Sequence, residues 1–560
     1  MNAQRMPWRF YGRQTQMEEL AHDLEFIPDR HNVRNGRRQF STCKIRGRRG
    51  LGKTALVLQL QAKAPSDLPI IYLELPNPDN VPTDGDPINV EAIARRITEL
   101  AEGHGSVPAR FGERVHRRLA AGRAWKDPHF KFQALLQALI KEGGVVVFDE
   151  FHLAKKLGLV TDIREVIRNC HDVGRKLDHP GKLVLMGSHQ QELQSLFASD
   201  APLYGTTNAY LHLHPWSLRT TMRVAAEHDI LPNPGKFLTL WTAYGGSPRN
   251  WQRYCTDERY APLHAINDED EWRRGFLAAE RNFLTEWKER FDARTTIELR
   301  EPERRILLWV GHHHPRGIKL KDIPFGDYAD KLAAVQMLET DLDLMSSHGP
   351  LLVRDHSRWK ISDQYTLFQL HVFPELMAQA DDQKIEGLRG RPELARLLSL
   401  EGVGLETLAT TFMGEQDGVT WHQSNVWHPR IAREGDIDVM AANVNTEPWT
   451  VWLGEAKRNE NDLYPGMIKA FQDRFLTTLG NSDEAKKIRT AKLQRQLFAT
   501  TFPRGSRERL RSAGFEAVDL HAMARSFGIE PWRKPVAANV PAEPEEENKP
   551  TEPPRPRMGM

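Results

Sequence analysis

Residues 47–54 form a glycine-rich string, Gly-x-x-x-x-Gly-Lys-Thr, which constrains this chain more than any other feature of its sequence. The glycines allow the backbone to curl around phosphate oxygens, the lysine can reach the β- and γ-phosphates, and the threonine hydroxyl can bind Mg²⁺. A strand-like segment, 40–45, precedes the string, and a helix-forming segment, 55–61, follows it. The sequence therefore predicts a strand–loop–helix unit that binds ATP or GTP. The expected nucleotide-binding residues of this loop are Gly47, Arg48, Arg49, Gly50, Leu51, Gly52, Lys53 and Thr54.

Hydrolysis at such a loop also requires a second strand that carries carboxylates. The apolar run 145–148 ends at Asp149 and Glu150, about 95 residues after the loop. We expect Asp149 to hold Mg²⁺ together with Thr54, and Glu150 to activate the attacking water.

Two later residues are candidates for contact with the nucleotide phosphates. Ser188 follows the next expected strand, and a simple turn at the strand end explains it equally well. Arg249 follows a Gly-Gly-Ser-Pro break between helical stretches. Arg249 could reach a phosphate from these helices or be solvated, and we favour the first.

The composition indicates a large globular protein. The chain has 560 residues, of which 40% are hydrophobic and 27% charged, and this length suggests three or four domains. No apolar run approaches the ~20 residues of a membrane span, and no secretory signal is visible. Three dispersed cysteines and a net charge of only +2 argue for a cytoplasmic location and against a generic polyanion binder.

The arrangement of apolar and helical segments divides the chain into parts. An α/β pattern with strands typical of a parallel sheet is followed by helices that could form a lid. Two helices and a hairpin then suggest a winged helix-turn-helix, and a second α/β unit follows. The expected parts are an ATPase core at 1–215, a helical lid at 216–292, a winged helix at 293–380, a nuclease-like α/β domain at 381–534 and a disordered Pro/Glu-rich tail at 535–560.

These pieces resemble the archaeal-type ATPases of the STAND group, which are signal-transduction relatives of AAA+ proteins. The resemblance covers about the first 290 residues, and Thr206 and Thr207 depart from it where that family commonly has an arginine. It implies ATP as the nucleotide, and oligomerisation on activation is plausible. The matching strings are Phe-Tyr-Gly-Arg at 10–13, the glycine-rich loop, Phe-Asp-Glu-Phe-His at 148–152, Met-Gly-Ser at 186–188, Pro-Leu-Tyr-Gly at 202–205 and Gly-Gly-Ser-Pro at 245–248.

The same resemblance implies a winged helix followed by a domain similar to PD-(D/E)XK nucleases, which have a restriction-endonuclease-like fold. Such a site needs acids on adjacent strands for Mg²⁺, a lysine two residues past the second acid, and often a helical glutamate. Asp438 competes with Asp436 for the first position, and the family pattern favours Asp438. Glu455 and Lys457 share one face of the next strand, and Glu406 can lie on a helix.

Together these features predict an ATP-dependent switch that controls a Mg²⁺-dependent nuclease. DNA is the favoured substrate, and the resemblance implies defence against phage or plasmids. The alternatives are an ATP-regulated DNA-binding protein with an inactive nuclease-like domain, and a transposition-type ATPase that recruits other machinery. At the expected wing tip, Arg354, Arg358 and Lys360 could contact phosphates or only pack between domains. The triplet 312–314, three histidines before a proline, indicates a solvated loop rather than a metal site.

Overall fold

The computed structural model of the chain describes most of the predicted elements. The described residues are 11–23, 41–47, 50–63, 69–75, 111, 114–115, 117–118, 128–174, 181–187, 193, 195–207, 209–291, 301–313, 315–324, 326–339, 352–355, 358–377, 391–426, 436–503 and 505–531. Of the expected features, Arg48, Arg49, Ser188 and the tail 535–560 lie outside the described residues. None of the described helices combines the length and apolar character that a membrane-spanning segment requires.

The N-terminal part is a five-stranded parallel sheet with the order β2-β3-β4-β1-β5. Every residue of β3 and β4 is buried, as expected for parallel strands that are covered on both faces. One face packs on α1 and α2, and the other packs on α5 and α6. The elements are α1 (Gln14–Asp23), β1 (Ser41–Arg46), α2 (Lys53–Lys63), β2 (Ile70–Glu74), α5 (Pro128–Lys141), β3 (Val145–Asp149), η3 (Phe151–Ala154), α6 (Val160–Gly174), β4 (Lys182–Met186) and β5 (Ala209–His212).

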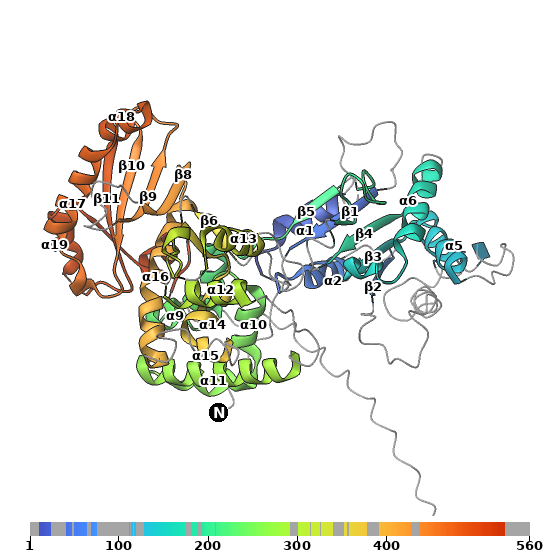
Figure 1. The fold of residues 1–560 in the computed structure, drawn as a ribbon, viewed down its shortest axis with the longest axis horizontal. Coiled ribbons are helices and arrows are strands. Elements are labelled where there is room, and N and C mark those ends of the chain that lie inside the picture. Colours follow the sequence, from blue (N-terminus) through green and yellow to red (C-terminus); the bar gives the residue numbers. More distant parts are fainter. Residues whose placement is uncertain are drawn as a thin grey trace, which may run out of the picture.

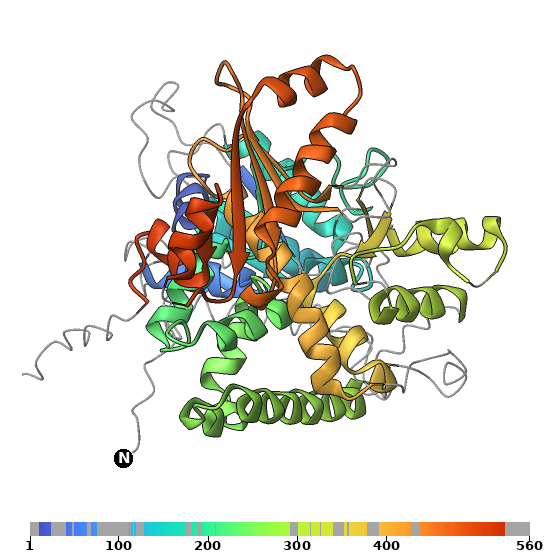
Figure 2. The same ribbon diagram turned by 90° about the vertical axis from the view of Figure 1, so that its left-hand side faces the viewer.

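A helical lid follows β5. Asn233 caps its second helix by accepting from the backbone N–H of Lys236, and Pro234 occupies the first turn, where its missing N–H costs nothing. The lid consists of α8 (Leu218–Glu227), α9 (Pro234–Tyr244), α10 (Pro248–Thr256), η4 (Glu258–Ala265) and α11 (Glu269–Phe291). In both views α11 lies along the lower edge of the helical section (Figures 1 and 2).

The segment where the sequence predicts a winged helix, called the winged-helix region below, contains helices and an antiparallel hairpin around a small apolar core. It consists of α12 (Glu301–His313), η5 (Leu320–Asp322), α13 (Tyr328–Glu339), β6 (Leu352–Asp355), β7 (Arg358–Ile361), α14 (Gln364–Val372) and α15 (Pro374–Met377). The prediction of a solvated loop was wrong for His312 and His313. Both are half-buried in the last turn of α12, and His312 Nδ1 lies 3.3 Å from the His371 carbonyl oxygen.

The C-terminal part is a mixed five-stranded sheet with the order β12-β11-β10-β9-β8. Strands β8 to β10 are antiparallel, whereas β10 to β12 are parallel. β12 is an edge strand, and β11, which the sequence analysis did not identify, lies between it and β10. The elements are α16 (Glu393–Gly414), β8 (Trp421–Val426), β9 (Ile437–Asn443), β10 (Thr450–Ala456), η7 (Glu460–Asp462), α17 (Pro465–Thr478), α18 (Asp483–Thr490), β11 (Lys492–Ala499), α19 (Ser506–Ser512), β12 (Glu516–Asp519) and α20 (Leu520–Ser526).

The lid and the C-terminal sheet share one hydrophobic core. That core joins Trp251 and Phe276 of the lid to Phe368 of α14, Leu405 of α16 and Phe498 of β11. The N-terminal sheet instead has two cores of its own. Figure 1 shows the two sheets at opposite ends of the molecule with the helical section between them. The shared core therefore crosses the boundary that the sequence suggested near residue 380.

Candidate functional sites

The glycine-rich loop connects β1 to the start of α2. Gly50 and Gly52 have φ angles of 84° and 87°, which a residue with a side chain would adopt only with strain. Lys53 opens α2, and its Nζ donates a 2.7 Å hydrogen bond to the carbonyl oxygen of Gly47. The amino end of a helix and a curled loop both present N–H groups to an anion. The loop thus has the geometry of a phosphate-binding site.

Thr54 and Asp149 lie together beside the loop. Thr54 Oγ1 donates to Asp149 Oδ2 at 2.7 Å, and the Tyr72 hydroxyl donates to the same oxygen at 2.6 Å. Burial and the bond to Asp149 raise the pKa of Tyr72, so its hydroxyl keeps its proton. A hydroxyl and a carboxylate are hard oxygen donors, which Mg²⁺ prefers, so Thr54 and Asp149 fit this ion. The sequence analysis missed Tyr72, which lies on β2, 77 positions before Asp149 in the chain.

Glu150 follows Asp149 at the carboxyl end of β3. Its backbone is left-handed, with φ 51° and ψ 38°, which is a strained conformation for a residue other than glycine. Its N–H donates to Asp149 Oδ1 at 2.8 Å, and its Oε2 lies 3.3 Å from His152 Nδ1. A left-handed residue breaks the extended backbone, and β3 accordingly ends at Asp149. The carboxylate is thus held next to Asp149 and the buried His152.

The lid contacts the glycine-rich loop through the first turn of α10. The backbone N–H of Arg249 donates to the Gly50 carbonyl at 3.2 Å, and an added Cβ on Gly50 would lie 3.1 Å from the Arg249 Cβ. Arg249 opens α10 after the Gly-Gly-Ser-Pro break, where the Gly246 carbonyl accepts from the Trp216 N–H at 2.7 Å. Buried Arg13 donates to the Leu51 carbonyl at 3.0 Å. The arginine predicted to reach a phosphate is therefore placed directly against the phosphate loop.

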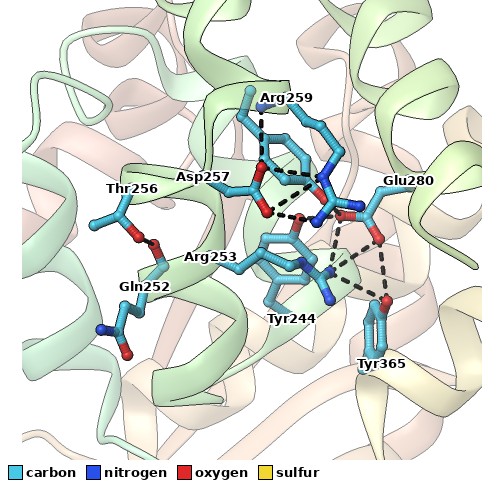
Figure 3. A network of polar contacts seen from close by, with 9 residues as sticks. Tyr244, Gln252, Arg253, Thr256, Asp257, Arg259, Glu280 and Tyr365 are labelled. Carbon is cyan, nitrogen blue, oxygen red and sulfur yellow. Dashed lines mark hydrogen bonds and ion pairs between the residues drawn. The ribbon is translucent and has the colours of Figure 1, made fainter. Parts of the chain in front are cut away.

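Behind this turn, the lid is built around a buried carboxylate, Glu280 of α11. Figure 3 shows Tyr244, Arg253 and Tyr365 converging on it. Arg253 donates to both Glu280 oxygens, at 2.9 and 3.0 Å, and the Tyr365 hydroxyl donates at 3.1 Å. Because Tyr365 belongs to α14, the network ties the lid to the winged-helix region. A buried carboxylate that accepts from this many donors favours one packing arrangement over looser ones.

The predicted carboxy-terminal acids lie on neighbouring strands. The β9–β10 register pairs Val439 with Gly454, so one step further it places Asp438 opposite Glu455 and on the same face. Asp438 Oδ2 accepts from Lys457 Nζ at 3.0 Å and from the Ala456 N–H at 2.9 Å. Lys457 Nζ also pairs with Glu455. The structure thus brings Asp438, Glu455 and Lys457 into one cluster.

The fourth predicted residue, Glu406, joins this cluster from α16. Its side chain is 2% exposed and forms a two-pronged ion pair with Arg316, whose Nε donates to Glu406 Oε2 at 2.9 Å. Burial and the charge of Asp438 raise the pKa of Glu406 to about 7, although Arg316 opposes the shift. Burial and Asp438 likewise raise the pKa of Glu455 to about 7, against the effect of Lys457. Three carboxyl groups are therefore close enough to repel one another.

The cluster has the donor chemistry of a Mg²⁺ site, because all its acceptors are carboxylate oxygens. Among the described residues, however, no three His, Cys, Asp or Glu side chains converge closely enough to hold an ion in this conformation. Two cationic side chains pair with these acids in place of an ion. Lys457 pairs with both Asp438 and Glu455, and Arg316 pairs with Glu406. Asp438 and Glu455 have the ligand chemistry that Mg²⁺ prefers, and in this conformation both pair with Lys457 Nζ.

A second buried carboxylate on α16 connects this cluster to the lid. Glu401 is fully buried and accepts from Thr239 Oγ1 of α9 at 2.5 Å and from Arg273 Nε of α11 at 2.9 Å. Its other oxygen lies 2.9 Å from Nε of Arg458, the residue after Lys457. The sequence analysis missed Glu401, Arg316 and Arg458. Glu401 and Glu406 are five positions apart on α16, which does not place them on one helix face, so no local pattern indicated Glu401.

Comparison with known proteins places the chain only broadly. Neither a family model nor a curated protein matches it. A Walker-type ATPase of Pyrococcus abyssi is similar at 14% identity and TM-score 0.40, over 64% of this chain and 96% of that one. The ORC2 protein of Aeropyrum pernix, solved as ADPNP–ADP complexes, is similar at 14% identity and TM-score 0.40, over 67% and 95%.

The ORC1 protein of Aeropyrum pernix, solved in complex with DNA, is similar at 13% identity and TM-score 0.32, over 66% of this chain and 94% of that one. Because these TM-scores are low, we assign the fold from this chain's own strand order and sequence motifs. The β2-β3-β4-β1-β5 sheet, the glycine-rich loop after β1 and the acids after β3 are those of a P-loop ATPase.

Proposed function

We propose that this chain is an ATP-dependent switch that controls a Mg²⁺-dependent nuclease in its C-terminal part. ATP would bind at Lys53 and Thr54, with Asp149 holding Mg²⁺ and Glu150 activating water for hydrolysis. The cluster of Asp438, Glu455, Lys457 and Glu406 would cut a phosphodiester of nucleic acid, with DNA favoured. A role in defence against phage or plasmids rests on the sequence resemblance alone.

The observation that carries the proposal is the convergence of Asp438, Glu455 and Lys457 on one face of two paired strands. When bound there, Mg²⁺ would neutralise the phosphate and lower the pKa of an attacking water. Burial opposes the charge of Lys457, but Asp438 and Glu455 outweigh it and raise its pKa to about 12. Lys457 therefore remains a cation near neutral pH. It suits stabilisation of charge on the phosphate and does not suit proton abstraction.

The path from the ATPase to this cluster supports the control function. Arg249 of the lid touches the phosphate loop, so a bound γ-phosphate can change how the lid sits. The lid is joined to the C-terminal part by a common core and by Glu401. Glu401 in turn holds Arg458, the neighbour of Lys457. A movement of the lid would therefore be transmitted to Lys457.

The test compares four purified proteins, namely wild type, Lys53→Ala, Glu150→Gln and Asp438→Ala. Each is incubated with linear and circular DNA, Mg²⁺, and either ATP or no nucleotide. We expect the wild type to cut, Asp438→Ala to hydrolyse ATP without cutting, and Lys53→Ala to lose nucleotide control. Wild type that shifts DNA on a gel but cuts it under no nucleotide condition would exclude the nuclease.

A second candidate, an ATP-regulated DNA-binding protein without nuclease activity, is favoured by the Arg316–Glu406 ion pair. In that case Arg316 and Lys457 would neutralise the acids permanently, and DNA would only be held. The two candidates differ in their response to Mg²⁺. A nuclease should lose its product but not its DNA complex on addition of EDTA, whereas a binding protein should form the same complex, without product, whether or not Mg²⁺ is present.

A further inference from the structure

A cavity of about 730 Å³ lies between the winged-helix region and the first half of α16. Four arginines line it, and three histidines complete its polar wall. Among the described residues of the lining, none is acidic. A concave surface with charge of one sign focuses the electrostatic potential and concentrates ions of the opposite sign. We call it the basic cavity, and its arginines are Arg316, Arg358, Arg391 and Arg396.

Separate segments bring these arginines together. Arg358 opens β7, whereas Arg391 is exposed just before α16. Arg396 is 6% exposed, donates to the Val372 carbonyl at 2.8 Å and pairs with Glu375 at 2.9 Å, which fixes that wall. The four arginines therefore line one hollow from the turn after α12, from the hairpin and from the start of α16. The packing-only interpretation of Arg358 does not explain why this wall collects positive charge.

Arg316 connects the basic cavity to the acid cluster. It lines the cavity, yet its guanidinium pairs with Glu406 through two hydrogen bonds. Its side chain is 46% exposed while that of Glu406 is 2% exposed, so the pair lies at the border between the open hollow and the buried site. A ligand in the cavity would therefore lie next to Asp438 and its neighbours.

We infer that the basic cavity binds the backbone phosphates of the nucleic-acid strand next to the phosphodiester that the acid cluster cuts. This inference rests on the proposed nuclease function. A guanidinium fork pairs with a phosphate as well as with a carboxylate. A backbone phosphate can thus replace Glu406 as the partner of Arg316, and Glu406 then becomes available to the acid cluster. An acidic protein segment is the other anion that such a surface could take, but it supplies no phosphodiester to the cluster beside it.

Binding is measured without cleavage, in an Asp438→Ala background with EDTA, by the fluorescence anisotropy of a short labelled oligonucleotide. Arg358→Gln and Arg391→Gln are combined in one variant. The matched control combines Lys469→Gln and Lys486→Gln, two exposed lysines of α17 and α18, and so changes the net charge equally. We expect Kd to rise about 10-fold only for the cavity variant. The slope of log Kd against log salt should also fall by about two, one for each lost phosphate contact.

Unchanged Kd and salt slope in the cavity variant would overturn the inference, as would an equal loss in the lysine control. Melting temperatures of both variants confirm that they are folded. If an acidic peptide binds the basic cavity more tightly than the oligonucleotide does, the ligand is an acidic protein segment and the inference is wrong. If the wild type cuts DNA while the cavity variant binds normally, only this inference fails. If the cavity variant loses binding but the wild type never cuts, the nuclease proposal fails and the binding site stands.

Discussion

The two α/β parts of this chain build their polar sites in opposite ways. At the N-terminal sheet the site is mainly backbone, from Gly50 and Gly52 in left-handed conformations to the amino end of α2. At the C-terminal sheet it consists of side chains, with Asp438 and Glu455 opposed across two strands. Inward-pointing N–H groups receive an anion, whereas converging carboxylates receive a cation. Under the proposed function, we therefore expect the first site to hold phosphate and the second to hold metal.

The two parts also differ in what they are attached to. The N-terminal sheet has its own cores and contacts the lid locally, as between Arg249 and Gly50, while Tyr11 ahead of α1 packs in the lid core and donates to Glu227. The C-terminal sheet shares its core with the lid and is bonded to it through Glu401. We therefore expect the lid and the C-terminal part to move together, and the ATPase core to move against both.

The largest expected effect separates the two chemistries. Asp438→Asn removes one negative charge from the acid cluster while keeping its size. We expect DNA cleavage to fall about 10³-fold, equivalent to about 4 kcal/mol of transition-state stabilisation. ATP hydrolysis should stay within about two-fold of wild type, because no described residue of the phosphate loop touches Asp438. Both rates are measured on the same preparation, with Asp436→Asn as the control for charge.

If Asp436→Asn abolishes cleavage and Asp438→Asn does not, the metal position is assigned to the wrong aspartate. If both activities fall together in Asp438→Asn, the two parts do not work as separate sites.

Glu401 offers a test of whether the lid is energetically coupled to the C-terminal part. Glu401→Ala leaves buried Arg273 without its innermost partner, and removing one member of a buried ion pair costs about 3–5 kcal/mol. We expect the lower end, because Arg273 keeps two exposed partners and Arg458 is 37% exposed. Calorimetry should show one transition that an ATP analogue raises and one that it does not, and the variant should lower the second.

The matched control is Asp270→Ala, which removes an exposed partner of the same arginine and should cost less than about 1 kcal/mol. A Glu401→Ala variant that lowers the nucleotide-sensitive transition instead would show that the lid belongs energetically to the ATPase core.

The sequence predicted the two sites unequally because their signals have different ranges. The buried strand ending at Asp149 is a local apolar run, and its position agrees with β3. β11 escaped notice because its first half, Lys492 to Arg495, is polar and only partly buried. No local pattern announces the bond from Arg316 to Glu406, which joins residues 90 positions apart. Acids on adjacent strands, and the lysine two residues past the second acid, could be proposed from spacing, but Arg316, which pairs with Glu406, could not.

The histidines of α12 show the same limit. A proline at 315 disfavours helix for the residue before it, which made a loop at 312–314 a reasonable expectation. The helix nevertheless continues to His313, where the His313 ring lies 4.2 Å from that of Trp309, one turn earlier. Packing against α14 thus decides the conformation, and that contact is not visible in a window of neighbouring residues.

A smaller effect is expected at the contact between the lid and the phosphate loop. Arg249→Ala removes the only lid side chain that we place against Gly50 among the described residues. We expect ATP affinity to fall about 10-fold, equivalent to about 1.4 kcal/mol, and ADP affinity to change much less, because the lost partner is the γ-phosphate. Arg223→Ala, at an exposed position of α8, is the control. Equal losses for ATP and ADP would assign Arg249 to loop packing alone.

The smallest effect concerns pH and the shared core. Burial lowers the pKa of His371 to about 4, and His371 Nδ1 lies 3.1 Å from the Gly311 carbonyl oxygen. In the unfolded chain His371 has its ordinary pKa of about 6.5. Below that pH the unfolded chain binds a proton that the folded chain does not bind, so stability falls as pH decreases from 6.5 towards 4. At pH 6 this amounts to about 1 kcal/mol relative to pH 7.5. His371→Asn keeps an N–H donor but does not titrate. The nucleotide-insensitive transition of this variant should therefore lose less stability between those pH values than that of wild type. An equal loss in both proteins would mean that other groups set the acid sensitivity of the lid and C-terminal part.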